Sequence, residues 1–236
     1  LNINEDTPIQ CQLTLTYYQD GAEKTVTRNQ PIKVLSKNAI SWEDTAQLAN
    51  FITAADTPIM ALKAAMLADK TKFMDKAEFL NNKLVEAVMV WEGLGELGIN
   101  YQADPVSPFQ TKKSTGEAGV QLDTVQFPRQ TIKLKSGDCD DLTALYASLF
   151  KAAGLNMALL DFPGHIALMV DTGETDAKNV GIPEEYLIKH GETWWVGIEG
   201  TMTGKDFYDG VKHLADLYKS YSAGEVKIFD AKALQK

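Results

Sequence analysis

The sequence has few cysteines, no long hydrophobic run and fewer basic than acidic residues. Only Cys11 and Cys139 occur among its 236 residues, which is too few to indicate a redox compartment. No apolar run reaches the roughly 18 residues that a transmembrane helix needs. Lys and Arg number 23 against 32 acidic residues, and the resulting net charge of −9 argues against nucleic acid or an anionic membrane as a partner.

The rest of the composition is typical of a soluble globular protein, with 44% hydrophobic and 23% charged residues. A chain of 236 residues holds one large domain or two smaller ones. It begins at Leu1 and carries no signal-peptide pattern. We therefore interpret it as a mature or excised fragment of a longer protein.

A helix is predicted to begin at Cys139. Asp138 is a good N-cap, Asp141 follows it with the spacing of a capping box, and Gly154 provides a stop. Between them, apolar residues recur at i, i+3, i+4, i+7 and i+8, at Leu142, Leu145, Tyr146, Leu149 and Phe150. Cys139 therefore falls at the first helical position.

This position favours an anion, because the backbone N–H groups there are unpaired and the helix dipole is positive. We expect the Cys139 thiol to ionise more easily than usual, as a nucleophile requires. Two alternatives stay open. A lone cysteine is usually a small buried apolar residue, and close aspartates would raise the pKa of a thiol instead of lowering it.

Three strands are predicted after this helix. Asn156–Phe162 contains a short apolar run, Pro163-Gly164 is a turn signal, and His165–Asp171 alternates. A polar loop then runs from Thr172 to about Glu192, and residues 193–199 form the third strand.

If the last two strands pair antiparallel with residue 171 opposite 193, His165 lies opposite Glu199. The carboxylate then reaches the imidazole, whereas a slip of one residue would place the two on opposite faces. His165 as an ordinary surface residue and Glu199 as a solvated turn residue are the alternatives.

These segments together resemble the bacterial transglutaminase-like cysteine protease superfamily, which has a papain-like fold. The resemblance covers about residues 50–210. It rests on the stretches Phe127-Pro128-Arg129-Gln130-Thr131, Gly137-Asp138-Cys139-Asp140-Asp141-Leu142, Leu145-Tyr146-Ala147-Ser148-Leu149, Ala153-Gly154, Pro163-Gly164-His165-Ile166 and Trp195-Val196-Gly197-Ile198-Glu199.

The resemblance implies Cys139 as the nucleophile, His165 as its base and Glu199, where many members carry Asp, as the residue that orients the base. Gln126 is the candidate oxyanion donor; Gln130 or the N–H groups at the helix start are alternatives, and structural roles for both glutamines are another. It also implies a protein or peptide substrate and an extracytoplasmic location, periplasmic or secreted.

No cofactor is expected, but some bacterial members of the superfamily bind calcium through acidic residues beside the cysteine. Asp138, Asp140 and Asp141 occupy such positions here. Calcium takes about six to eight oxygens, so three carboxylates are too few on their own, and helix capping is the favoured role.

The N-terminal segment has a different pattern. Residues 9–17 alternate as in a half-buried strand, Asp20-Gly21 marks a turn, and Lys24–Val34 gives a return strand. We predict a partial β module or β-sandwich hairpin at 1–36, with Cys11 in its core, and a transglutaminase-like domain at 37–236.

Residues 42–100 are predicted to be mainly helical, with a helix start at Asp56-Thr57-Pro58 and a longer helix from about Asp75 to Leu94. The stretch from Asn100 to Gln126 reads as a long loop that forms one wall of a substrate cleft.

The predicted fold is α+β, and the predicted chemistry is cysteine-dependent acyl transfer at amide bonds, with water as the favoured acceptor. Protein crosslinking by transamidation is one alternative. A non-catalytic binding or structural module that keeps the fold is the other.

Overall fold

The computed structural model describes residues 3–103 and 122–230, which divide into two compact units, Leu1–Ala39 and Ile40–Lys236. The first unit is an antiparallel ribbon of β1 (Thr7–Gln19) and β2 (Ala22–Val34). Asp20 and Gly21 both have positive φ, as a tight hairpin turn requires, so the predicted hairpin is confirmed.

Within this unit the ribbon has no second layer: Leu13 and Leu15 are 53% and 65% exposed, and Cys11 is partly buried. The predicted half-burial, with Cys11 in a core, therefore needs a covering layer from outside the described residues of this unit and stays a prediction. Alternation in a sequence shows which side chains share a face of a strand, but burial also needs a second layer to cover that face.

In the part of the second unit that the structure describes, helical segments accompany a main sheet. The helical segments are η1 (Thr45–Phe51), α1 (Thr57–Met66), α2 (Lys70–Lys76), α3 (Asn82–Leu97), α5 (Pro128–Leu134), α6 (Cys139–Ala153) and α7 (Phe207–Ser220). Short 3-10 turns η2 (Ala177–Asn179), η3 (Glu184–Tyr186) and η4 (Gly200–Met202) lie in the connections.

The main sheet has five antiparallel strands in the order β11-β7-β8-β10-β9. These strands are β7 (Met157–Phe162), β8 (His165–Asp171), β9 (Leu187–His190), β10 (Thr193–Ile198) and β11 (Lys227–Asp230). Two small pairs accompany it: β3 (Ala39–Ser41) with β5 (Leu122–Thr124), and β4 (Asn100–Tyr101) with β6 (Ser136–Gly137).

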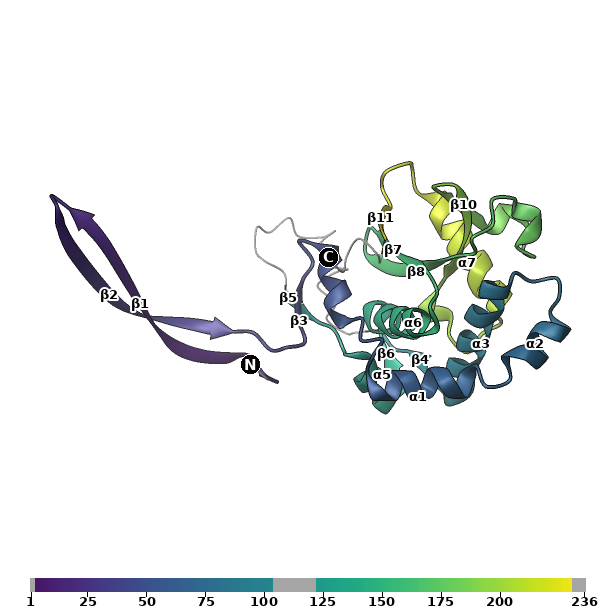
Figure 1. Cartoon of the computed structure of the whole chain (residues 1–236), viewed down its shortest axis with the longest axis horizontal. Coiled ribbons are helices and arrows are strands. Elements are labelled where there is room, and N and C mark those ends of the chain that lie inside the picture. The colour runs from purple at the N-terminus through teal and green to yellow at the C-terminus, as the bar shows by residue number, and fades with distance from the viewer. Residues whose placement is uncertain (1–2, 104–121, 231–236) are drawn as a thin grey trace. The chain divides into compact units, whose positions relative to one another are not determined.

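Helix α6 is the central element of this unit. It packs on one face of the sheet with α1, α3 and α5 around it, while α7 covers the other face (Figure 1). Segregated helices and an antiparallel sheet make the class α+β, as predicted.

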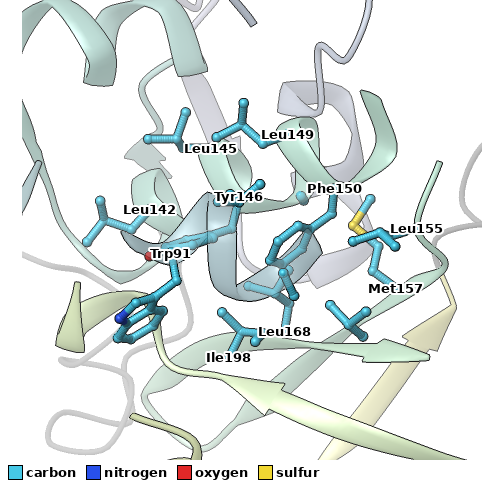
Figure 2. Close-up of a cluster of buried hydrophobic side chains, with 14 of the residues drawn as sticks. Trp91, Leu142, Leu145, Tyr146, Leu149, Phe150, Leu155, Met157, Leu168 and Ile198 are labelled. Atoms are coloured by element: carbon cyan, nitrogen blue, oxygen red, sulfur yellow. The ribbon is translucent and has the colours of Figure 1, made fainter. Parts of the chain in front are cut away.

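The core is built around α6, in which every residue from Asp140 to Phe150 is buried. Leu142, Leu145, Leu149 and Phe150 belong to one buried cluster with Trp91 of α3 and with Leu168 and Ile198 of the sheet. Figure 2 shows Phe150 on the side of Leu168 and Ile198, and Leu145 and Leu149 on the other side of α6. Each such large side chain stabilises the fold by about 1.5–3 kcal/mol through removal from water. Helix α6 also carries Thr143, Ala144, Ala147 and Ser148, all buried, whose small side chains allow close approach of neighbours. The start of α6 is therefore held in a rigid setting.

The strand prediction is accurate for β8, whose observed bounds are those expected, but its register with β10 is wrong by two residues. Asp171 pairs with Trp195 instead of residue 193, and Leu168 pairs with Ile198. A shift of two preserves the faces of both strands, because side chains alternate with a period of two.

Two other boundaries also differ from expectation. Helix α3 starts at Asn82 instead of about 75, because Asn81 caps it through its side chain and a separate helix, α2, ends at Lys76. The expected polar loop after β8 contains the edge strand β9, which pairs with β10. Among the described residues, no helix is long and apolar enough to cross a membrane.

Candidate active site

Cys139 occupies the first position of α6, as predicted. The Asp138 side chain accepts from the backbone N–H of Asp141 at 3.4 Å, and the Asp141 side chain accepts from the backbone N–H of Asp138 at 3.3 Å. This reciprocal capping box is the one expected from the sequence. It fixes the entry of the chain into α6, and with it the position of Cys139.

The sulfur of Cys139 lies beside the start of β8. It is partly buried and receives a hydrogen bond from the backbone N–H of Ile166, the residue after His165. The Thr143 hydroxyl donates to the Ile166 carbonyl at 3.2 Å, which ties the first turn of α6 to the same strand. The nucleophile and the base of the predicted site are thereby brought to neighbouring ends of α6 and β8.

The ionisation of Cys139 differs from the expectation. Burial raises the pKa of the Cys139 thiol well above its usual value, and the carboxylates of Asp140 and Asp138 raise it further. The Ile166 N–H acts in the opposite direction but does not outweigh them. A helix start favours an anion, yet here desolvation and two adjacent negative charges have the larger effect. The thiol is therefore protonated near neutral pH.

His165 and Glu199 are joined by a hydrogen bond of 2.8 Å between Nε2 and Oε2. Glu199 follows the end of β10 and is 1% exposed, while the His165 side chain is 22% exposed. The other carboxylate oxygen of Glu199 accepts from the hydroxyl of Thr201 at 2.7 Å and from its backbone N–H at 3.1 Å. The carboxylate is thus held on both sides, and Nδ1 is the ring nitrogen of His165 that Glu199 does not engage.

The charge state of Glu199 follows from these contacts. Burial alone would raise the pKa of Glu199, but the bonds from His165 and Thr201 outweigh it and leave the pKa below its ordinary value. Glu199 is therefore ionised at neutral pH and fixes one orientation of the imidazole.

A pocket of about 300 Å³ opens beside these two residues. It is lined by Tyr101, His165, Glu199, Thr201, His213 and Leu217. Its walls come from β4, β8, η4 and α7, so four separate elements converge on the imidazole. A concave site with convergent polar groups is the usual setting of a substrate site.

Tyr101 is a member of this site that the sequence analysis did not single out. It pairs in β4 with Gly137 of β6, two residues before Cys139, and is 40% exposed. Partial burial raises the pKa of the Tyr101 phenol, and the nearby Cys139 and Asp138 act in the same direction. The hydroxyl is therefore protonated and able to donate. Tyr101 begins the stretch predicted as a wall of the cleft, most of which, residues 104–121, lies outside the described residues.

Gln126 lies close to the start of α6, but its donors are engaged. Its backbone N–H donates to Asp141 at 2.7 Å, and its side-chain amide donates to Asp141 and to the Ser136 carbonyl. Gln130 accepts from the backbone N–H of Phe127 at 2.7 Å as part of the capping of α5. In this arrangement both glutamines organise the loops before Cys139, and the side-chain donors of Gln126 are turned toward Asp141 and Ser136.

Gly137 is required by the same arrangement. A Cβ added there would lie 2.6 Å from the Cβ of Asp141, closer than non-bonded carbons approach. Any other residue would displace Asp141 and the loop that it holds.

Asp138, Asp140 and Asp141 place one oxygen each within 4.8 Å of one another. Burial raises the pKa of Asp140, and its hydrogen bond to Asp138 raises it further. The capping box explains Asp138 and Asp141, whose oxygens accept backbone N–H groups. Calcium takes about six to eight oxygen ligands at calcium–oxygen distances of about 2.3–2.6 Å. Among the described residues, this cluster offers three carboxylates, two of which are engaged in capping, so it does not fit calcium.

Comparison with known proteins gives no relative: no family model, no curated protein and no solved structure matches the chain.

Proposed function

We propose that the chain catalyses cysteine-dependent acyl transfer at amide bonds, with water as the usual acceptor, in a papain-like arrangement of the transglutaminase-like kind. The observation that carries this proposal is the 2.8 Å bond between His165 and a buried, ionised Glu199, at the strand start beside Cys139. A nucleophile, a base and a carboxylate that orients the base form the general set for such chemistry.

In the first step, His165 accepts the thiol proton of Cys139 at Nδ1 while the sulfur attacks the carbonyl carbon of the substrate. Because the thiol pKa is raised, this proton leaves during the attack and not before it. The imidazolium, stabilised by Glu199, then gives the proton to the departing amine as the C–N bond breaks. A water molecule attacks the thioester, loses its proton to His165 and releases the acid, and the thiol is restored.

The oxyanion of each tetrahedral intermediate needs hydrogen-bond donors. The backbone N–H of Cys139 is one, because N–H groups at a helix start lack intrahelical partners. The hydroxyl of Tyr101 is our candidate for the second, since it is protonated and lines the pocket that contains His165. Gln126, with its donors turned toward Asp141, is not needed in this scheme.

The substrate that we propose is a protein or peptide in an extracytoplasmic compartment. Transfer to an amine instead of water would make the enzyme a crosslinking transglutaminase, and the same residues would serve it. The two outcomes differ only in which nucleophile reaches the thioester.

A non-catalytic module is the second candidate, and the raised pKa of the Cys139 thiol favours it. In that case the His165–Glu199 bond is a structural contact and the pocket beside it binds without reaction.

An acylation experiment separates the candidates. The protein is mixed at neutral pH with an activated peptide ester, and adducts on Cys139 and Cys11 are mapped by mass spectrometry. We expect a transient acyl group on Cys139, and none after His165→Ala. Cys11 is the internal control for ordinary thiol reactivity. If Cys139 and Cys11 react equally, and peptides are not hydrolysed, the chain is not a cysteine acyltransferase.

A further inference from the structure

A second, larger pocket of about 660 Å³ lies elsewhere in the second unit, and the proposed reaction does not use it. It is bounded by three segments that are distant in sequence: residues 42–45 at the start of η1, residues 161–164 at the turn between β7 and β8, and residues 225–229 at β11. Its volume lies within the range of about 300–1,000 Å³ that ligand sites occupy.

The lining of this pocket combines aromatic rings with an excess of negative charge. Trp42 and Phe229 supply the rings. Glu43, Asp44, Asp161 and Glu225 supply four carboxylates, against the single positive charge of Lys227, for a net charge of −3. Rings and carboxylates together are the surroundings that a guanidinium or ammonium group prefers.

Three of the four carboxylates are held in place. Asp161 accepts from the Thr45 hydroxyl at 2.8 Å, Asp44 from the backbone N–H of Ala46 at 3.0 Å, and Glu225 from the backbone N–H of Ser222 at 2.6 Å. Each of these bonds uses one oxygen, so within residues 3–103 and 122–230 the other oxygen remains to accept from a ligand. Acceptors fixed in this way lose little side-chain entropy on binding.

The pocket adjoins the proposed reaction site through the Pro163-Gly164 turn, which lines it and leads directly into His165. In acyl transfer the base delivers its proton to the departing amine, so the leaving part of the substrate lies on the side of His165. A chain that continues from the departing amine along this turn would place a side chain in the pocket.

We infer that this pocket binds a lysine or arginine side chain on the leaving-group side of the cleaved amide, and so selects basic polypeptide substrates. The inference rests on the proposed function for the position of the basic residue, but the binding of a basic peptide can be measured without any turnover.

The test uses the full chain with Cys139→Ala, so that peptides bind and do not react. Fluorescent peptides of alanine and glycine carry lysine, arginine, norleucine or glutamate at one position, and dissociation constants come from fluorescence anisotropy. We expect the lysine and arginine peptides to bind about tenfold more tightly than the norleucine peptide, in keeping with a charge-assisted contact, and the glutamate peptide to bind worst.

The pocket is tested with Glu43→Gln/Glu225→Gln, which removes two charges but keeps hydrogen-bond acceptors. The matched control is Glu184→Gln/Glu185→Gln, which removes two exposed charges from η3, outside the pocket lining. We expect the first variant to weaken the lysine peptide about threefold to tenfold, as for partly exposed ion pairs, and the control to leave it unchanged. Equal binding of lysine and norleucine peptides, or equal loss in the two variants, overturns the inference.

The same peptides given to the wild-type protein distinguish this failure from failure of the proposed function. If the protein hydrolyses peptides without preference for basic ones, the proposed function stands and the inference about the pocket is wrong. If basic peptides bind selectively but are not hydrolysed and do not acylate Cys139, the pocket binds basic peptides and the proposed enzymatic function is wrong.

Discussion

His165 and Glu199 are hydrogen bonded although Glu199 lies beyond the paired residues of β8 and β10. The carboxylate reaches the imidazole from the residue that follows β10, where Glu199 also caps the turn η4. This dual contact makes Glu199 a positioning residue whose charge and geometry can be separated by mutation.

Glu199→Gln should lower kcat by about 10²-fold, because the amide keeps the shape of the carboxylate but no longer stabilises the imidazolium. The measurement is steady-state peptide hydrolysis, with a thermal melt to show that the fold is retained. The matched control is Asp171→Asn at the other end of β8, which should leave kcat unchanged. If Asp171→Asn is the damaging change and Glu199→Gln is silent, Glu199 does not orient the base.

Tyr101→Phe should lower kcat about tenfold or more with little change in KM, since its hydroxyl is proposed to stabilise the oxyanion and not the bound substrate. The side chain is 40% exposed, so the variant should melt like the wild type. Tyr208→Phe is a suitable control, because Tyr208 is also exposed, at 41%, and does not line the pocket of His165. A change in KM alone would reduce Tyr101 to a binding contact.

The parts of the site that the sequence predicts are those set by local rules. The start of α6 follows from the N-cap Asp138 and the apolar repeat after it, and both act within a few residues. The sequence predicts the His165–Glu199 contact with a register that is wrong by two residues, and the contact is kept because an even shift leaves both side chains on one face.

The parts that the sequence does not predict depend on tertiary structure. Tyr101 reaches the site through a parallel pairing with Gly137, which no local pattern indicates. The direction of the Cys139 pKa shift depends on how much protein surrounds the sulfur, and a helix-start position gives no information on that. The exposed face of β1, with Leu13 and Leu15, likewise reflects what covers a strand and not its own sequence.

Alkylation of Cys139 should require alkaline pH. Its raised pKa leaves little thiolate at pH 7, so the midpoint of iodoacetamide labelling should lie above the value of about 8.5 of a free thiol. Asp140→Asn removes a neighbouring negative charge and should lower this midpoint. Cys11, which lies in the first unit, provides the reference in the same sample. Rapid labelling of Cys139 at pH 6 would show instead that a thiolate is already formed in the resting protein.

The stability of the fold should fall as pH rises through the titration of Asp141. Burial, with Asp138 nearby, raises the pKa of Asp141 to about 6 from its ordinary value of 3.8. The folded state therefore binds this proton more tightly than the unfolded chain does, and the stabilisation present below pH 3.8 is lost between there and pH 6. At about 1.4 kcal/mol per pKa unit, the loss is about 3 kcal/mol at most.

Urea unfolding from pH 3.5 to 7 measures this loss of stability, and Asp141→Asn, which cannot titrate, should remove this component from the profile. The lowered pKa of Glu199 acts in the opposite direction, so the informative quantity is the difference between the two proteins at each pH. A constant difference across this range would show that Asp141 ionises alike in the folded and unfolded states.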